Sequence, residues 1–369
     1  MFSLFKKWSP PPSQELTFKS RVEQFWKWYA QSAQRFYDTI ESGNCPILAN
    51  EVSAKVDELL PGFAWVFGPG EGGRGHSFTL SGEGVLHRQL LAIYCASRAP
   101  RMDEWTFYAS RQPGSVEGVR MEIGGHKFDP MEFWITPKID CEAEKVDITV
   151  WHPLFAHLHK ESERLSSLFL FLDEALGEFG TGQWIGEIES NDTRLADAIP
   201  LKELYGFIKK LEAEKGWQKL PPGEAGVVYR REERANRFLR DDVIVGSTTH
   251  PDLVNEYYRA EGRLQNPLVG TGADYVFVSF DSRFFPKADE MVEKRAAIED
   301  ALNQTLQLAR SGRLLGGAFG TQFGYIDLLL FDGRNSLEIV ERVLHERNLP
   351  TGTAINFFAK EKSGQRVVL

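Results

Sequence analysis

The stretch 67-FGPGEGGRGHSFTLSGEG-84 decides how this sequence is interpreted, because Gly68, Gly70 and Gly73 have the spacing of a dinucleotide-binding loop. In a dinucleotide-binding fold the third glycine opens a helix, and the N-terminus of that helix holds the pyrophosphate. Here Gly73 is followed by RGHSFTL, which alternates polar and apolar residues as a strand does. The stretch therefore predicts two strands joined by a glycine-rich hairpin loop at 68–75, and it argues against a nucleotide site.

The residues on either side of this hairpin predict helices that cover a small sheet. Positions 18–41 carry aromatic and aliphatic residues at helical spacing, and 49–60 predicts a second helix that stops at Pro61. A third helix is predicted over 85–98, after the second strand of the hairpin.

The middle of the chain predicts further strands and two helices. Strands are expected at 119–128, 131–139, 145–151 and 182–190, and helices at 158–176 and 201–216. The proline- and glycine-containing stretch 216-GWQKLPPGEAG-226 then interrupts the pattern, as a linker does.

The C-terminal part has the clearest pattern of the chain. The expected elements are strand 274–281, helix 289–311, strands 313–319 and 324–331, helix 336–347 and strand 353–359. This βαββαβ order is that of a ferredoxin-like unit. A second glycine-rich stretch, 316–324, is predicted to close the central hairpin, although its backbone N–H groups are also suited to holding an anion.

These elements predict an α+β protein built from sheet-plus-helix layers. A chain of 369 residues is expected to form two or three domains. We expect an N-terminal region over 15–215, divisible into 15–113 and 114–215, a connecting segment over 216–272, and a ferredoxin-like domain over 273–369.

Composition limits the classes of function. The net charge of -9 disfavours a general nucleic-acid or anionic-membrane binder. The cysteines Cys45, Cys95 and Cys141 are far apart and form no C-x-x-C pair, so neither a zinc pair nor a disulfide framework is expected. The first residues lack the apolar core of a signal peptide, and no run reaches the ~18 apolar residues of a membrane helix. We expect a cytoplasmic protein without a cofactor.

Three neighbouring histidines, His152, His157 and His159, are candidate metal ligands. However, His157 and His159 are two positions apart, which places them on different sides of a helix. The spacing favours a polar loop that leads into a helix over a metal site.

Asp327 and His76 are the candidate catalytic residues. Asp327 lies in the apolar strand 325-YIDLLLF-331, where burial of a carboxylate is costly unless the carboxylate is paired. The structural alternative, which we favour because structural ion pairs perturb carboxylates too, is a strand face that is partly solvated at an interface. That face carries Tyr325, Asp327, Leu329 and Phe331.

The stretch 229-YRREERANRFLR-240 brings together the arginines at 230, 231, 234, 237 and 240. On a helix several of them would line one side and could bind phosphate. The acidic residues at 232, 233, 241 and 242 nearly cancel their charge, so a salt-bridged surface is expected.

Four quoted segments resemble a bacterial family that is classified as a domain of unknown function. They are 25-FWKWYAQSAQRFYDTIESG-43, 78-FTLSGEG-84, 99-APRMDEWTFYASRQP-113 and 172-LDEALGEFGTGQWIGEIE-189. The resemblance covers about residues 20–215, and the C-terminal half is similar to a region that accompanies this family. It implies a bacterial cytoplasmic origin and no particular catalytic residues.

The sequence has neither a G-x-S-x-G nucleophile motif nor a phosphate-binding P-loop. We therefore expect a non-enzymatic protein-interaction or adaptor protein. One alternative is a hydrolase or transferase whose site, with Asp327, His76 and the histidines at 152–159, lies between the two halves. The other is a small-ligand sensor.

Overall fold

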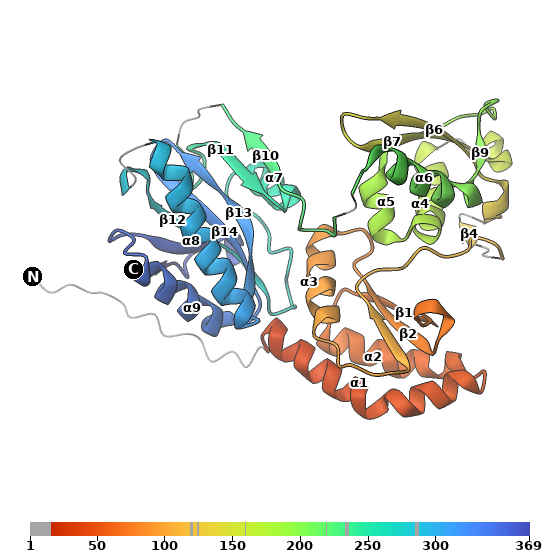
Figure 1. Cartoon of the computed structure of the whole chain (residues 1–369), viewed down its shortest axis with the longest axis horizontal. Coiled ribbons are helices and arrows are strands. Elements are labelled where there is room, and N and C mark those ends of the chain that lie inside the picture. The colour runs from red at the N-terminus through yellow and green to blue at the C-terminus, as the bar shows by residue number, and fades with distance from the viewer. Residues whose placement is uncertain are drawn as a thin grey trace, which may run out of the picture. The chain divides into compact units, whose positions relative to one another are not determined.

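The computed structural model describes residues 16–118, 121–123, 125–158, 160–218, 220–232, 236–284 and 288–369. The chain forms two compact units, which are described separately (Figure 1). Unit 1 combines the chain up to Pro61 with Gly223–Leu369, and unit 2 is Gly62–Pro222.

The first helices of unit 1 follow the predicted aromatic stripe. They are α1 (Phe18–Glu41), the 3₁₀ segment η1 (Cys45–Leu48) and α2 (Ala49–Leu59). Thr17 caps α1 by accepting a hydrogen bond from the Ser20 amide. Phe18, Phe25 and Phe36 of α1 are fully buried, which confirms that the stripe is a packing face.

Unit 1 also contains a seven-stranded antiparallel sheet of order β10-β11-β13-β14-β12-β15-β16. The strands are β10 (Val227–Arg230), β11 (Val243–Thr248), β12 (Asp274–Asp281), β13 (Gly312–Gly320), β14 (Phe323–Leu330), β15 (Ala354–Phe357) and β16 (Val367–Val368). Its helices are α7 (Pro251–Arg259), α8 (Ala288–Leu308) and α9 (Gly333–Glu346). Short 3₁₀ segments are η6 (Ser282–Phe284) and η7 (Lys360–Lys362).

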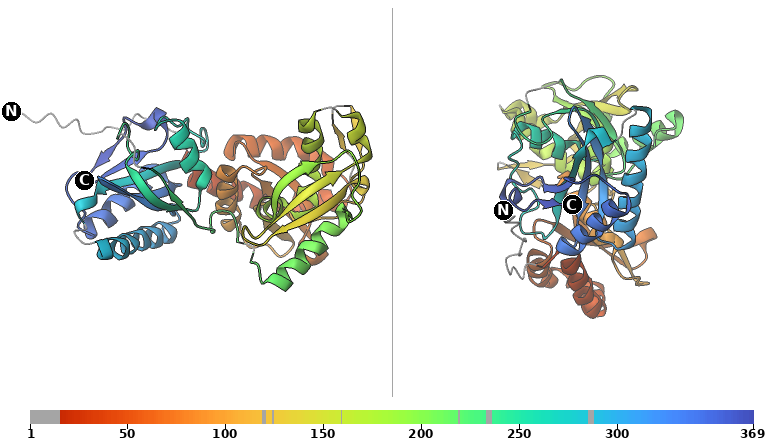
Figure 2. Two further views of the ribbon diagram at one scale, coloured as in Figure 1. Left: turned by 90° about the horizontal axis from the view of Figure 1, so that it is seen from above. Right: turned by 90° about the vertical axis from the view of Figure 1, so that its left-hand side faces the viewer.

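The two faces of this sheet differ. On one face, alternate residues of β12 and β14, such as Val278 and Leu328, pack against α8 and α9 (Figures 1 and 2). On the opposite face, Phe277, Tyr325 and Asp327 are also buried. The expectation that this second face is partly solvated is therefore wrong, because every one of these side chains is covered.

The predicted βαββαβ order is present as β12-α8-β13-β14-α9-β15, and the α+β class is confirmed. Assignment of this part to the ferredoxin-like arrangement stays a prediction. The sheet is wider than expected, because β10 and β11 from the expected connecting segment 216–272 add to one side of it. Edge pairing uses backbone groups of any sequence, so the pattern of residues gives little sign of it.

Unit 2 begins with the hairpin of the glycine-rich stretch. β1 (Ala64–Pro69) pairs antiparallel with β2 (His76–Ser81), and η2 (Glu71–Gly73) lies between them. Helix α3 (Leu86–Ser97) then leads to β3 (Trp105–Tyr108), which is parallel to β2. The predicted strand–loop–strand structure at 67–81 is confirmed, and Gly73 opens no long helix.

The rest of unit 2 holds a four-stranded sheet of order β8-β7-β6-β9 and a separate β4-β5 hairpin. These strands are β4 (Met121–Ile123), β5 (His126–Phe128), β6 (Trp134–Asp140), β7 (Lys145–Trp151), β8 (Ile185–Ser190) and β9 (Ile199–Pro200). The helices are α4 (Glu161–Leu176), α5 (Glu178–Trp184) and α6 (Leu204–Lys215), with 3₁₀ segments η3 (Pro130–Glu132), η4 (Pro153–His157) and η5 (Leu201–Glu203). A core that includes Phe133, Phe155 and Phe171 joins this sheet to its helices.

Candidate functional site

The candidate carboxylate Asp327 forms a buried ion pair with Arg240. The Arg240 guanidinium contacts both carboxylate oxygens, with Nη1 on Oδ1 and Nη2 at 3.0 Å from Oδ2, and both side chains are 1% exposed. Burial raises the pKa of Asp327, and the guanidinium opposes that shift. A structural ion pair therefore accounts for this carboxylate.

Aromatic rings enclose the cation of this pair. The guanidinium carbon of Arg240 lies 5.0 Å from the ring centre of Tyr325 and 5.3 Å from those of Phe277 and Phe358. Arg240 Nη2 also donates to the Tyr229 hydroxyl at 3.3 Å. Cation–π contacts and a carboxylate together replace the water that the guanidinium loses on burial.

The second glycine-rich stretch does hold an anion, and that anion belongs to the chain itself. Asp242 Oδ2 accepts hydrogen bonds from the backbone N–H groups of Gln322, at 2.9 Å, and Phe323, at 3.0 Å. Tyr325 donates to Oδ1 at 2.6 Å. A Cβ atom at Gly320 would overlap the Asp242 carboxylate, so the glycine leaves the space that this carboxylate fills.

An open pocket of about 370 Å³ lies beside this buried network. It is formed by the end of β10, the residue that follows it and one side of α7, and its described lining residues are Tyr229, Arg230, Arg231, Val254, Asn255, Tyr258 and Arg259. Tyr229 joins the pocket to the buried pair, because it lines the pocket and hydrogen-bonds to Arg240. We refer to this site as the arginine–tyrosine pocket.

The arginine–tyrosine pocket is positively charged. The Arg231 guanidinium stacks on the Tyr258 ring at 3.4 Å from its centre, and Nη2 is 3.9 Å from Asp241 Oδ1. Arg230 and Arg259 are exposed, and neither forms an ion pair with another described residue. Burial raises the pKa of Tyr229, so this phenol stays neutral at physiological pH.

The described residues of the arginine-rich stretch are not helical: β10 ends at Arg230, and 231–232 and 236–240 form neither helix nor strand. Arg237 matches the expected salt-bridged surface, since it pairs with Asp241 at 3.3 Å and with Glu261 at 3.2 Å. Arg234 lies outside the described residues. Asp241 and Asp242 are both buried, Asp241 beside Arg231 and Asp242 on the second glycine-rich stretch, so neither pairs with Arg230 or Arg259.

Of the candidate histidines, His152 has a structural role. His152 is fully buried, its Nδ1 accepts from the Leu154 amide at 3.1 Å, and it caps η4. Burial lowers the pKa of His152 to about 4. His157 is exposed at the end of η4, and His159 lies outside the described residues. Within the described part of the chain, no three or more His, Cys, Asp or Glu side chains are placed to hold a metal ion.

His76 and Asp327 belong to different units. His76 lies on β2 of unit 2, where its ring centre is 5.9 Å from that of Trp105. Asp327 lies on β14 of unit 1.

Unit 2 contains a buried carboxylate that sequence reasoning missed. Glu178, at the start of α5, is 2% exposed and accepts from Ser81 Oγ at 2.7 Å, from the Gly84 amide and from Gln89 Nε2. Nearby, burial raises the pKa of Asp173, and Arg111 opposes this shift from 3.3 Å. No spacing in the sequence links Glu178 to the 81–84 loop, which lies about ninety residues earlier.

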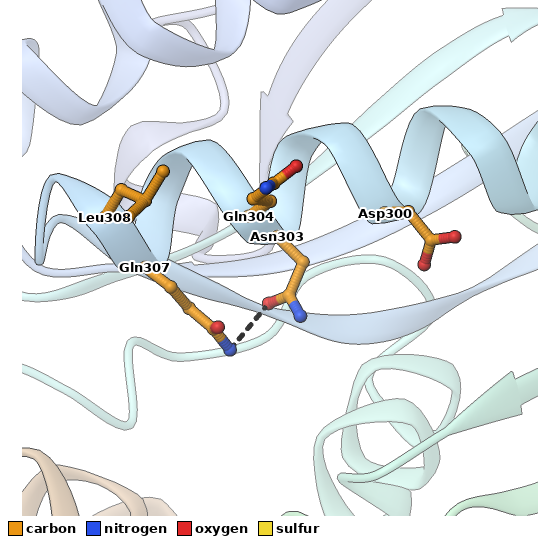
Figure 3. A pocket seen from close by; sticks show the side chains of 5 residues that line it. All are labelled: Asp300, Asn303, Gln304, Gln307 and Leu308. Carbon is orange, nitrogen blue, oxygen red and sulfur yellow. Dashed lines mark hydrogen bonds between the residues drawn. The ribbon is translucent and has the colours of Figure 1, made fainter.

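A second hollow, of about 500 Å³, lies over α8. Figure 3 shows its labelled side chains, Asp300, Asn303, Gln304, Gln307 and Leu308, projecting from one helix. Gln307 donates to Asn303 at 3.3 Å, and Asn303 also accepts from the Leu314 amide. The hollow is a polar stretch of helix surface and lacks charged groups converging from several elements, so the arginine–tyrosine pocket is the stronger candidate.

Comparison with protein-family models, with curated proteins and with solved structures finds no match to this chain. The resemblance to a bacterial family of unknown function therefore stays a prediction. Among the described residues, no helix combines the length and apolar character that crossing a bilayer requires.

Proposed function

We propose that this protein is a non-enzymatic interaction protein of the bacterial cytoplasm, and that the arginine–tyrosine pocket binds a negatively charged group of its partner. The observation that supports this proposal is the convergence of Arg230, Arg231 and Arg259 on one open pocket. The chain as a whole is acidic, with a net charge of -9, so this local excess of positive charge runs against the global charge.

The chemistry of the lining residues suits an oxyanion with an adjoining flat group. Guanidinium groups bind carboxylates and phosphates through paired N–H donors. The Asn255 amide adds polar atoms, and the rings of Tyr229 and Tyr258 add apolar surface. A carboxylate or a phosphate monoester fits this combination.

The environments of the candidate catalytic groups favour recognition over catalysis. Asp327 is held by Arg240, and His152 caps η4. The described lining of the pocket contains no carboxylate, imidazole, thiol or serine to act as base or nucleophile. The enzyme alternative thus loses Asp327 and His152 as available groups.

A small-ligand sensor is the second candidate, and it would use the same pocket. The volume of about 370 Å³ lies within the range of small-molecule sites, about 300–1,000 Å³. This candidate is favoured if a free small anion binds as tightly as the same anionic group carried by a polypeptide.

The proposal is tested by titrating phenyl phosphate and benzoate into the full-length protein by isothermal titration calorimetry. We expect millimolar binding that weakens as salt is added, because the attraction is between charges. Replacing Arg230 and Arg259 together by Gln should weaken binding about tenfold, the loss expected for one to two exposed charged contacts.

Arg342→Gln is the matched control, because Arg342 is an exposed arginine of α9 outside the pocket. It should leave the affinity for phenyl phosphate unchanged. Absence of binding by either anion, or an equal loss in the control, would contradict an anion site at this pocket.

A further inference from the structure

We propose that the outer edge of β10 takes up an extended acidic peptide as an additional strand, with one peptide carboxylate in the arginine–tyrosine pocket. This inference rests on the proposed function, and it specifies the partner as a peptide segment with alternating acidic and apolar residues. It is built on three observations: the unpaired edge of the sheet, the exposure of its side chains and the position of the pocket.

β10 is the terminal strand of the seven-stranded sheet, and within the described residues it pairs with β11 alone. The Arg231 amide donates to Ile244 O at 2.8 Å, so the backbone groups of residue 231 point toward β11. Backbone direction alternates along a strand, and the N–H and C=O groups of Val228 and Arg230 therefore point away from the sheet. These groups are the ones that a further strand would pair with.

Two of the four side chains of β10 are exposed valines. Val228 is 70% exposed and Val227 is 48% exposed. Natural edge strands are commonly blocked by proline, inward-pointing charge or a bulge. β10 contains no proline, and its pairing with β11 is regular over all four residues. Such an edge is a template for strand addition.

The pocket lies where alternate side chains of an added strand would point. Tyr229 of β10 reaches Arg240, and Arg231, the residue that follows β10, stacks on Tyr258, so these two side chains lie on the α7 side of the sheet. A strand paired with β10 would run about 4.8 Å from it. Every second side chain of that strand would face Asn255 and Arg259 of α7, which line the same pocket.

The charges of this region select the peptide. Arg231 and Arg259 favour a carboxylate on the α7 side of the added strand. Exposed Val228 lies on the opposite side and favours an apolar neighbour across the strands. A single-stranded nucleic acid has the charge for the pocket, but it does not reproduce the N–H and C=O ladder that the edge presents.

The test uses the full-length protein and a fluorescent peptide of alternating Glu and Val residues, with binding measured by anisotropy. We expect micromolar binding. A Lys–Val peptide should not bind, and N-methylation of alternate Glu–Val amides should weaken binding about tenfold or more, because it removes ladder hydrogen bonds.

Two variants separate the edge from the pocket. Val228→Pro removes an outward N–H and leaves the bonds to β11, so it should weaken the peptide about tenfold and leave phenyl phosphate binding unchanged. Arg259→Gln should weaken both ligands, and Arg342→Gln should weaken neither. Circular dichroism checks the fold of each variant. Amide exchange of Val228 and Arg230 in the unaltered protein gives a second measurement, in which bound peptide should slow exchange.

Each contrary result has a distinct meaning. Strand addition would be overturned if the N-methylated peptide bound as tightly as the unmodified peptide, or if the Val228 and Arg230 amides stayed unprotected in the complex. The proposed anion site would still stand in that case if phenyl phosphate bound to the pocket. Tighter binding of a thymidine oligonucleotide than of the Glu–Val peptide would also overturn the peptide proposal. Failure of the peptide and of phenyl phosphate together would overturn the proposed function.

Discussion

Units 1 and 2 each bury a carboxylate in a loop rich in glycine, yet the surroundings of the two carboxylates differ. Asp242 of unit 1 is held by the Gln322 and Phe323 amides, and Glu178 of unit 2 is held by the Gly84 amide and two side chains. In both units a glycine-containing loop already holds an internal carboxylate. The comparison teaches that glycine-rich loops alone do not mark a ligand site in this protein.

What distinguishes unit 1 is the cationic charge that remains after its carboxylates are paired. Arg240 is neutralised by Asp327, whereas Arg230 and Arg259 line an open pocket. In unit 2, Arg111 is shared between Asp173 and Glu83, at 3.3 and 3.2 Å. An unmatched positive charge beside an open volume is therefore the feature that selects the candidate site.

The largest effect is expected from Asp327→Ala in unit 1. This change leaves the Arg240 guanidinium buried without its partner, and breaking a buried pair costs about 3–5 kcal/mol. The measurement is the free energy of unfolding of unit 1, from urea titration followed by amide exchange of unit 1 peptides.

Asp300→Ala is the control, because Asp300 is an exposed carboxylate of α8. It should change the free energy of unfolding by less than about 0.5 kcal/mol. A loss below about 1 kcal/mol for Asp327→Ala would contradict the assigned role of the Arg240–Asp327 pair.

The next effect is a pH dependence of opposite sign in the two units. Burial lowers the pKa of His152 in unit 2 to about 4, below the ordinary 6.5, so the unfolded state binds more protons and acid destabilises unit 2. Burial raises the pKa of Glu299 in unit 1 to about 7, above the ordinary 4.5, so the native state binds more protons and acid stabilises unit 1.

Between pH 7 and pH 4.5 each effect should amount to about 2–3 kcal/mol. Amide exchange of the two units at several pH values in this window measures both. His152→Asn, which keeps a capping acceptor, should flatten the slope in unit 2, and the exposed His157→Asn should not. Parallel slopes in the two units would refute the assigned environments.

The smallest effect is a contrast between two amide substitutions. In Asp242→Asn the new NH₂ group must face either two backbone N–H donors or Tyr325, whose hydroxyl already accepts from the Arg240 amide at 3.1 Å. The expected loss in the free energy of unfolding is about 1–3 kcal/mol.

In Glu178→Gln the amide oxygen keeps the Gly84 and Gln89 donors, and the NH₂ group can donate to Ser81, whose hydroxyl rotates readily. A loss below about 1 kcal/mol is expected. Chemical denaturation of the two variants, with the exposed Glu187→Gln as control, measures the difference. Equal losses would show that the two carboxylates are held alike.

Local patterns in the sequence determined much of the secondary structure. The aromatic spacing of 18–41, the hairpin around 68–75 and the βαββαβ order after residue 273 all depend on contacts between residues close in the chain. Such contacts impose a period of 3.6 or 2 on the residues, and that period is visible without coordinates. The sequence also singled out Asp327, because a charged carboxylate interrupts the apolar strand 325–331.

Tertiary structure alone decided which residues meet. The partners of Asp327 and Asp242 lie eighty or more positions away, and the pocket joins β10 to α7, which are separated in the sequence by β11. Sheet order placed β10 at an edge, and residues 223–272 of the expected connecting segment became part of unit 1. Contacts between distant residues follow from chain topology and burial, which leave no fixed spacing in the sequence, and so the candidate site was visible there only as a run of arginines.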